Sequence, residues 1–284
     1  MPSWTVDTPV DMDFDDVTEL NVRLIGGTVA VLATDDRPSL TVRDINGRPL
    51  QVEHSDGRLT VSYETLTWER LLDFLKTYND RAEVTITVPA GCPIRLGVVS
   101  ASALVSGLTS GASVKGVSGD ITLDGLAGDV LANTVSGELL ARDLDGTVTF
   151  ASVSGALTLA DGTIGAMTAE SVSGQVTADI TLGPKGGAQV STVSGEVTLR
   201  LPADADARVR LNSMSGRVRS EFDSLQLKKT PGQRSASGNV GAGAGQVAVT
   251  TVSGPITLLR RPDRRASTHA ETPHAQAGTE SETR

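Results

Sequence analysis

The sequence predicts an all-β protein whose main part is a parallel β-helix, and three observations support this. A Ser-Gly dipeptide, usually preceded by Val, recurs through the second half of the chain. Alternating apolar residues flank each copy, which is typical of strands with one buried face. Aromatic residues make up only 3% of the sequence although hydrophobic residues make up 38%. The core must therefore consist of Val, Leu, Ile and Ala, which suit thin, regularly stacked layers.

Residues 1–98 are predicted to form a β-rich N-terminal segment. Apolar and polar residues alternate through residues 20–33, and Gly26-Gly27 in the middle of this stretch predicts a hairpin. Asn46-Gly47 and Asp56-Gly57 predict two further hairpins, because these residues tolerate positive φ angles.

One stretch of this segment has a different period. Between Thr67 and Asn79 the apolar residues fall at helical spacing, which predicts a short amphipathic helix packed on the adjacent sheet. A strand follows over residues 84–88 and ends at Pro89, which cannot donate a hydrogen bond to a neighbouring strand.

The repeats predict a β-solenoid of about eight or nine coils over residues 99–261. The serines of the Ser-Gly pairs recur every 16 to 22 residues, and Val99-Ser100-Ala101 has the form of a degenerate first copy. A period near twenty is typical of solenoids, in which each repeat is one layer of a stack. The repeat weakens between Ser215 and Ser237, where Pro231-Gly232 indicates a loop. Residues 262–284 are polar without apolar periodicity and are predicted to be a disordered tail.

Each repeat contains two predicted strands that meet at the Ser-Gly pair. Inward-facing apolar residues stand four and six positions before the serine, and three and five positions after it. Because this pattern changes from even to odd spacing at the motif, we expect a corner there, with glycine supplying an unusual φ angle. Asp-Gly pairs at 124–125, 145–146 and 161–162 are expected to form the second corner. The residues of the predicted structural corner ladder are Ser118, Gly119, Ser136, Gly137, Ser154, Gly155, Ser173, Gly174, Ser194, Gly195, Ser215, Gly216, Ser253 and Gly254.

The residues that carry catalysis in other proteins do not form a recognisable set in this sequence. A nucleophilic serine needs a base within hydrogen-bond reach, but His54 precedes the repeats and the other two histidines follow them. The candidate carboxylates for glycoside chemistry are Asp120, Asp124, Asp129, Glu138, Asp143 and Asp145. Most of them stand beside glycine, where aspartate is a common turn former. Cys92 is the single cysteine and is expected to be buried or inert. The sequence predicts no catalytic residue, no cofactor and no metal site.

Charge is distributed unevenly along the chain. The net charge is −9, yet residues 1–90 carry 16 acidic and 8 basic residues whereas residues 200–265 carry 5 acidic and 12 basic ones. The chain as a whole is acidic, and few aromatic residues lie near its basic segment, which argues against nucleic-acid binding. The basic residues form a candidate interaction patch that consists of Arg208, Arg210, Arg217, Arg219, Lys228, Lys229 and Arg234. The alternative is that these side chains are a solvated face.

The location expected for this chain is the cytoplasm. Its first residues are acidic and lack the apolar stretch of a signal peptide. No window approaches the ~18 apolar residues that a transmembrane helix requires.

The repeated SVSG and TVSG steps, the Asp-Gly pairs and the segment ending in Val88-Pro89-Ala90-Gly91 resemble the bacterial putative-adhesin family. The resemblance covers residues 4–260 and implies a β-solenoid domain. It implies no activity, cofactor or catalytic residue.

Three functions are consistent with the sequence. The favoured hypothesis is a non-enzymatic scaffold, adhesin-like, that binds a protein or surface partner. One alternative is a carbohydrate-binding or carbohydrate-active β-helix, which requires paired carboxylates or aromatic platforms in a groove. The other alternative is a cytoplasmic β-helix that self-assembles through an uncovered end coil. The acidic first segment of one molecule and the basic segment of another are also expected to attract each other head to tail.

Overall fold

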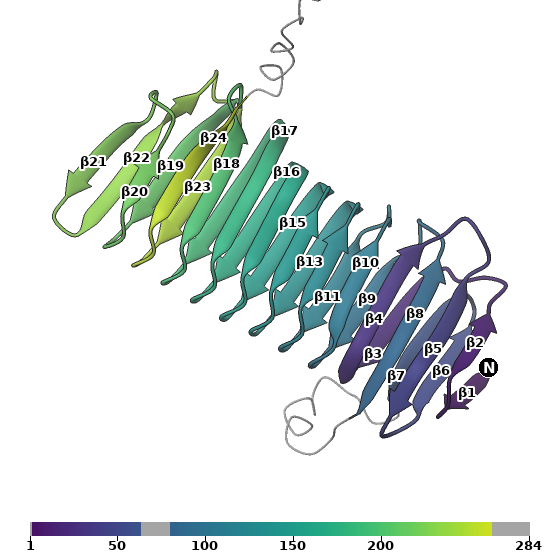
Figure 1. The fold of residues 1–284 in the computed structure, drawn as a ribbon. Helices are drawn as coiled ribbons and strands as arrows, with labels where there is room; N and C mark the ends of the chain where they lie inside the picture. Colours follow the sequence, from purple (N-terminus) through teal and green to yellow (C-terminus); the bar gives the residue numbers. More distant parts are fainter. Residues whose placement is uncertain (1, 64–79, 263–284) are drawn as a thin grey trace, which may run out of the picture.

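The structure, a computed structural model, describes residues 2–63 and 80–262 of the chain. Every regular element in these ranges is a β-strand, so the all-β class is confirmed for the part of the chain described. The strands stack side by side into an elongated body (Figure 1). The helix predicted over residues 67–79 and residues 263–284 of the predicted tail lie outside the described residues.

Each repeat contributes one strand to each of two parallel ladders, which meet at the Ser-Gly corners. The first ladder contains the strands that precede the corners, among them β9 (Ile94–Val98), β11 (Ala112–Gly116), β13 (Ala127–Thr134) and β15 (Asp145–Ser152). The second ladder contains the strands that follow them, among them β10 (Ser102–Ser106), β12 (Ile121–Asp124) and β14 (Leu139–Arg142). Parallel pairing of equivalent strands is what the repeat predicted, and it is observed; the number of coils stays a prediction.

Two long strands run through both ladders. The first part of β16 (Leu157–Ser171) pairs with β14 and its second part pairs with β15. The next strand, β17 (Val176–Thr192), follows β16 in the same way and is joined by β18 (Val197–Pro202) in the second ladder. The chain therefore bends at the second corner without interrupting the strand.

The last repeats do not stack in sequence order. In the first ladder β23 (Gly245–Thr251) lies between β17 and β19 (Ala207–Ser213). In the second ladder β24 (Ile256–Arg261) lies between β18 and β20 (Val218–Ser220). The final repeat of the sequence, with its corner at Ser253, thus lies between the two repeats whose corners are at Ser194 and Ser215 (Figure 1).

The Ser-Gly pair at Ser237 continues the spacing of the repeats but is not a corner. Ser237 lies within β22 (Gln233–Val240), which pairs antiparallel with β19 on one side and with β21 (Gln226–Thr230) on the other. A hairpin of two antiparallel strands therefore ends the first ladder, and the Ser-Gly dipeptide there is part of a strand.

The N-terminal segment extends both ladders. In the first ladder β3 (Glu19–Leu24) pairs parallel with β9 and with β7 (Arg58–Tyr63). In the second ladder β4 (Gly26–Ala33) pairs parallel with β10 and with β8 (Arg81–Val88). The predicted hairpin at Gly26-Gly27 is therefore wrong, because β3 and β4 lie in different ladders and this glycine pair follows a corner.

The remaining N-terminal strands are antiparallel and complete this end of the body. In the second ladder β5 (Ser39–Asn46) pairs with β8 and with β2 (Val10–Asp13), and in the first ladder β6 (Leu50–Ser55) pairs with β7 and with β1 (Ser3–Val6). The hairpin predicted at Asn46-Gly47 is wrong, since β5 and β6 do not pair. The hairpin at Asp56-Gly57 is confirmed, with φ angles of 51° and 75°.

The core is a single cluster of buried side chains from both ladders, from Val6 to Leu258, and it spans the predicted boundary at residue 98. Side chains at equivalent positions stack on one another. Phe150 is the largest of its row and lies opposite Ala132 in one neighbouring strand and Ala169 in the other. The two small side chains leave the space that the phenyl ring fills, which keeps the interior close-packed.

This packing predicts that Phe150→Ala lowers the free energy of unfolding by about 3–5 kcal/mol, because neither neighbouring alanine can fill the cavity. Urea denaturation followed by circular dichroism measures the loss. Thr149→Ala, at the half-exposed neighbouring position, is the control and should change stability by no more than about 0.5 kcal/mol. Equal losses in the two variants would contradict this account of the core.

Candidate interaction surface

The serine hydroxyls of the corner ladder are used within the fold. Ser136 Oγ donates to the Val117 carbonyl at 3.1 Å, and Ser154 Oγ donates to the Val135 carbonyl at 3.1 Å. In both cases the serine backbone N–H donates to the same carbonyl oxygen. The same contact recurs at Ser118, Ser173, Ser194, Ser215 and Ser253. Each serine therefore ties its corner to the corner of the adjacent coil.

The corner glycines are required by close backbone packing, not by their φ angles. None of the seven lies in the left-handed region, so the predicted role in supplying an unusual φ angle is wrong. A Cβ atom on Gly137 would lie far inside contact distance of the Gly119 carbonyl oxygen, and Gly155 and Gly174 face the next corner glycine in the same way. Only a residue without a side chain allows corners to stack this closely.

A second hydroxyl, two positions before the serine, completes the corner. Thr134 Oγ1 accepts a hydrogen bond from the Gly137 N–H at 3.2 Å, and Ser171 Oγ accepts one from the Gly174 N–H at 2.9 Å. These hydroxyls are buried, and they satisfy backbone groups that would otherwise be unpaired. The sequence reasoning missed them. The signal was present, because this position is serine or threonine in six copies of the motif: Thr134, Ser152, Ser171, Thr192, Ser213 and Thr251.

The residue before the serine is the apolar position of the corner that is exposed to solvent, in six of the seven copies. Its side chain is between 45% and 60% exposed at Val135, Val153, Val172, Val193, Val252 and Met214. Hydrogen bonds between successive corners arrange these six residues in one continuous row in that spatial order. We call this row the valine ridge. Its side chains are spaced by ~4.8 Å, the distance between hydrogen-bonded strands.

Acidic side chains flank the valine ridge. Exposed Glu138 and Glu196 stand three residues after ridge valines on one side. On the other side Glu170 borders a hollow of about 350 Å³, whose lining includes Val172 and Val193. A basic residue, Arg217, occurs at the Met214 end of the row. The central part of the ridge is therefore an apolar row between carboxylates.

The predicted basic patch lies at one end of the body and is divided between strands of both ladders. Arg208 and Arg210 point outward from β19, Arg219 lies on β20, and Lys228 and Lys229 lie on the outermost strand β21. Arg217 lies between the Ser215 corner and β20, and Arg234 on β22 donates to the Gly216 carbonyl at 3.4 Å. A joint binding role for the seven residues stays a prediction.

The second corner differs from the prediction. Gly125, Asp143 and Asp161 occupy equivalent places in successive coils and have φ angles of 62°, 51° and 54°. Asp145-Gly146 instead aligns with Ala127-Gly128 in the first ladder. The three Asp-Gly pairs are thus not equivalent, and aspartate itself adopts the left-handed conformation at two of the corners.

A polar cavity of about 580 Å³ lies beside this second corner and includes Asp143, Asp161 and Arg261 in its lining. Arg261 donates to the buried Asp179 carboxylate at 3.0 Å, and Arg200 donates to the same carboxylate at 2.8 Å. These interactions pair the charges of Asp179, Arg200 and Arg261 with one another.

Asp124, another predicted candidate for glycoside chemistry, pairs with Arg142 at 3.5 Å. The exposed large hydrophobic residues of the described ranges include one aromatic, Trp4, at the N-terminal end and remote from this cavity.

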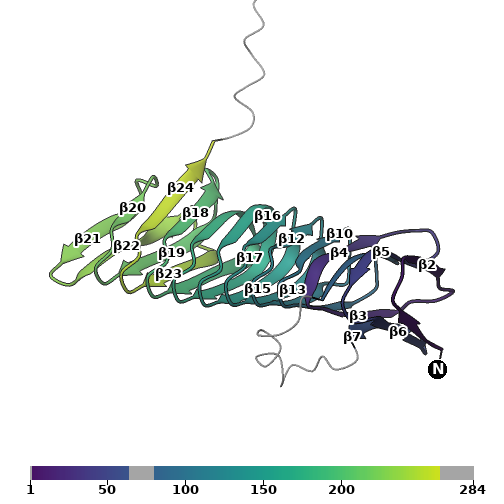
Figure 2. The ribbon, with the colours of Figure 1, turned by 60° about the horizontal axis from the view of Figure 1, so that its bottom comes forward.

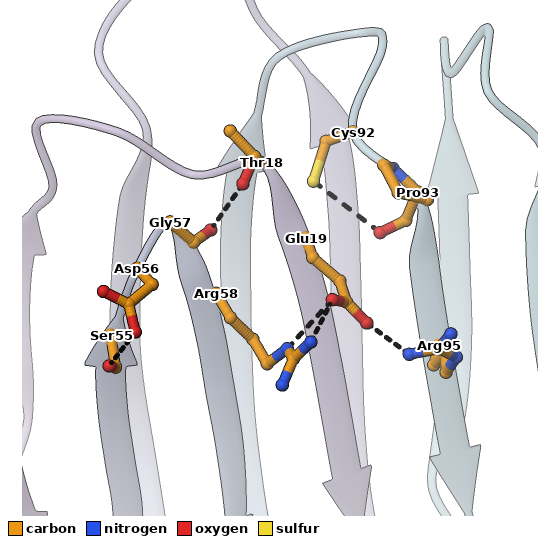
Figure 3. Close-up of polar contacts among 9 residues, drawn as sticks. All are labelled: Thr18, Glu19, Ser55, Asp56, Gly57, Arg58, Cys92, Pro93 and Arg95. Atoms are coloured by element: carbon orange, nitrogen blue, oxygen red, sulfur yellow. Dashed lines mark hydrogen bonds and ion pairs between the residues drawn. The ribbon is translucent and has the colours of Figure 1, made fainter.

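A second ion-pair cluster surrounds Glu19 on the first ladder (Figure 3). Glu19 lies between Arg58, at 2.8 Å, and Arg95. The hydrogen bond from Arg58 is the main cause that lowers the pKa of Glu19. Nearby Cys92 is 2% exposed, and burial raises the pKa of its thiol to about 11. Cys92 is therefore protonated at neutral pH and is a poor nucleophile.

Groups suited to metal binding or base catalysis do not come together in the residues that the structure describes. No set of three or more His, Cys, Asp and Glu side chains there could hold a metal ion. His54 contacts the backbone oxygen of Asp16 at 2.6 Å in the N-terminal segment, away from the serine ladder. Among the same residues, no helix is long and apolar enough to cross a membrane.

A family model described as Toastrack DUF4097 matches residues 17–259. The chain belongs to this family. The matched range contains all seven Ser-Gly corners and the whole valine ridge, and it begins after the edge strands β1 and β2. No curated protein matches the sequence.

Solved structures similar to this Toastrack chain share little sequence with it. A protein from Parabacteroides distasonis described as a putative lipid binding protein is 14% identical over 89% of this chain and 97% of its own, with a TM-score of 0.46. Two proteins described as putative adhesins, from the same species and from Bacteroides fragilis, are 13% and 11% identical, with TM-scores of 0.43 and 0.42. They cover 89% and 92% of this chain and 96% and 97% of their own. At these TM-scores the similarities carry no argument about function.

Close packing of the corner glycines predicts that Gly155→Ala destabilises the Toastrack fold by at least about 1–3 kcal/mol, because the new methyl group collides with the Gly137 carbonyl. Thermal or urea unfolding measures the change. Gly91→Ala is the matched control, since a Cβ atom there meets nothing within 4 Å, and its effect should stay within about 0.5 kcal/mol. If both variants were equally stable, close approach would not be the reason for the glycine.

The raised pKa of Cys92 predicts slow alkylation of the folded chain. At pH 8 its thiolate fraction is small because the pKa is about 11, whereas an unperturbed thiol is partly ionised at that pH. Iodoacetamide labelling followed by mass spectrometry should therefore be much faster after unfolding in urea than before it. Equal labelling rates would show that Cys92 is accessible and reactive.

Proposed function

We propose that this Toastrack-family chain is a non-enzymatic β-solenoid scaffold that binds a polypeptide partner along the valine ridge. One observation carries the proposal. Within the corner motif the first hydroxyl, the serine and the glycine each make contacts that the stack requires, whereas the valine points into solvent. A row of six half-exposed apolar side chains approaches the few hundred Å² of a functional surface patch.

The chemistry of the ridge indicates a basic amphipathic partner. Burying the apolar row favours an apolar stripe on the partner, with about 25 cal/mol gained per Å² removed from water. Glu138, Glu170 and Glu196 beside the row favour lysine or arginine next to that stripe. One turn of an α-helix rises ~5.4 Å, close to the ~4.8 Å between ridge side chains. A helix with one apolar residue per turn therefore matches the ridge over two or three turns, before the difference of about 0.6 Å per turn accumulates.

Synthetic peptides test this function directly. The probe is a fluorescein-labelled amphipathic helix with leucine on one face and lysine beside it, and its partner probe carries glutamate in place of lysine. We expect the lysine peptide to bind the full chain and the glutamate peptide to bind much more weakly, because of the flanking carboxylates. Fluorescence anisotropy titration measures both affinities.

Ridge variants provide the control within the chain. Val153→Thr/Val172→Thr/Val193→Thr keeps the shape of each side chain but adds a polar group, and should weaken binding of the lysine peptide at least tenfold. Leu104→Thr/Leu131→Thr removes two exposed apolar residues that lie outside the ridge and should leave binding unchanged. The proposal fails if the ridge variant binds as tightly as the unmodified chain, or if both variants lose binding equally.

A further inference from the structure

The body ends in four short edge strands, two at each end. At the N-terminal end these are β1 in the first ladder and β2 in the second, and at the other end they are β21 in the first ladder and β20 in the second (Figure 1, Figure 2). Within the described ranges each of the four has one hydrogen-bonded neighbour. The outer edge of each strand therefore presents unpaired backbone groups, which can pair with another chain.

Strand directions at the two ends are compatible with each other. In the first ladder β1 pairs antiparallel with β6, which pairs antiparallel with β7, so β1 runs in the same direction as the parallel strands of that ladder. At the other end β21 pairs antiparallel with β22, which pairs antiparallel with β19, so β21 runs in that direction too.

In the second ladder β2 pairs antiparallel with β5, which pairs antiparallel with β8, and β20 pairs parallel with β24. Both β2 and β20 therefore run in the same direction as the parallel strands of the second ladder. A second copy placed end to end would thus continue the first ladder with a parallel pair, β1 beside β21. The second ladder ends at β20, two strands before β21, so the hydrogen-bonded contact is confined to the first ladder.

The two ends carry opposite charges. Residues 2–18 include five exposed aspartates and no lysine or arginine: Asp7, Asp11, Asp13, Asp15 and Asp16. Residues 217–234 contain five basic residues against two acidic ones, Glu221 and Asp223. Arg219 lies on the edge strand β20, and Lys228 and Lys229 lie on the edge strand β21. Contact between unlike ends is attractive, whereas contact between like ends is repulsive.

Exposed apolar side chains accompany these charges at both ends. Trp4 on β1 is 37% exposed and lies opposite the buried Val52, while Leu227 on β21 is 58% exposed and lies opposite the buried Ala236. Both therefore point to the core side of the first ladder, where they close its two ends. A joined pair of ends would cover both side chains and continue the core.

We propose that copies of this chain associate head to tail, the acidic end of one molecule against the basic end of the next. The contact differs from the valine ridge and does not depend on it. Such a contact joins two different surfaces, so it propagates into filaments and does not stop at a dimer. The edge strands are only three to five residues long, and each end of the body is one coil wide, so the interface between two molecules is small. Association is therefore weak and depends on protein concentration and salt.

Sedimentation velocity of the full chain tests this assembly over about a hundredfold range of concentration. In ~0.01 M salt, where charges interact over ~30 Å, the mean sedimentation coefficient should rise with concentration. In ~1 M salt, where the range falls to ~3 Å, it should fall toward that of the monomer. A monomer at every concentration and salt level would overturn the proposal.

Charge reversal separates head-to-tail contact from other association. One variant carries Asp7→Lys/Asp11→Lys/Asp13→Lys and the other carries Arg219→Glu/Lys228→Glu/Lys229→Glu, so each has two ends of like charge. Each alone should stay monomeric, and an equimolar mixture should assemble again, because every acidic end then meets a basic end of the other variant. Circular dichroism spectra that match the unmodified chain confirm that both variants are folded.

A third variant controls for net charge. Lys115→Glu/Arg142→Glu/Lys185→Glu changes the net charge as much as the Arg219→Glu/Lys228→Glu/Lys229→Glu variant does, but at exposed positions in the middle of the stack. It should assemble as the unmodified chain does. Assembly of either end variant alone, failure of the mixture to assemble, or loss of assembly in the mid-stack variant would each contradict the head-to-tail contact.

Discussion

Close contact between backbones at the Ser-Gly corners is the constraint on which the rest of the structure depends. Each corner glycine lies so near the next corner that no side chain fits between them. The serine before it donates both its N–H and its hydroxyl to the neighbouring coil. These contacts hold equivalent residues one strand spacing apart, and the two ladders of parallel strands extend from them. The alternation of inward side chains, including Phe150 between two alanines, follows from that alignment.

The same constraint explains why the motif carries four residues and why they differ in role. The buried hydroxyl two positions before the serine satisfies the glycine N–H on the inside of the corner. Serine and glycine complete the contact between coils. Valine is the apolar residue that the corner leaves exposed, and its repetition converts a folding motif into a continuous apolar ridge. A functional surface can thus arise at the one position where stacking imposes no contact.

Much of this architecture could be predicted from sequence periodicity. The all-β class, the two strands per repeat and the inward positions follow from the alternation of apolar residues on both sides of each serine. The position of β23 and β24 between two earlier repeats could not be predicted, because the Ser-Gly corners at Ser194, Ser215 and Ser253 are compatible with any order of stacking. Gly26-Gly27 was misleading for a related reason: a glycine pair is compatible with a hairpin and with a corner, and only long-range pairing distinguishes them.

The site was less predictable than the fold. The recurrence of the motif drew attention to serine and glycine, whose contacts lie within the stack. The exposure of the valine could not be predicted, because it depends on the direction in which the chain turns at the corner. The reason for glycine was also hidden, because a requirement for close approach and a requirement for positive φ select the same residue. The basic residues near the end of the sequence were visible as a cluster, yet their division between two ladders follows from strand pairings that composition does not report.

Unfolding free energies of single variants through one corner, Ser171-Val172-Ser173-Gly174, test the central claim most directly. Gly174→Ala should lose the most stability, by its collision with Gly155. Ser171→Ala should lose about 1–3 kcal/mol, because it leaves the buried Gly174 N–H without an acceptor. Ser173→Ala should lose less, and Val172→Thr should stay within about 0.5 kcal/mol of the unmodified chain. A loss at Val172 as large as that at Ser171 would show that the valine serves the fold, and would contradict its assignment to an interaction surface.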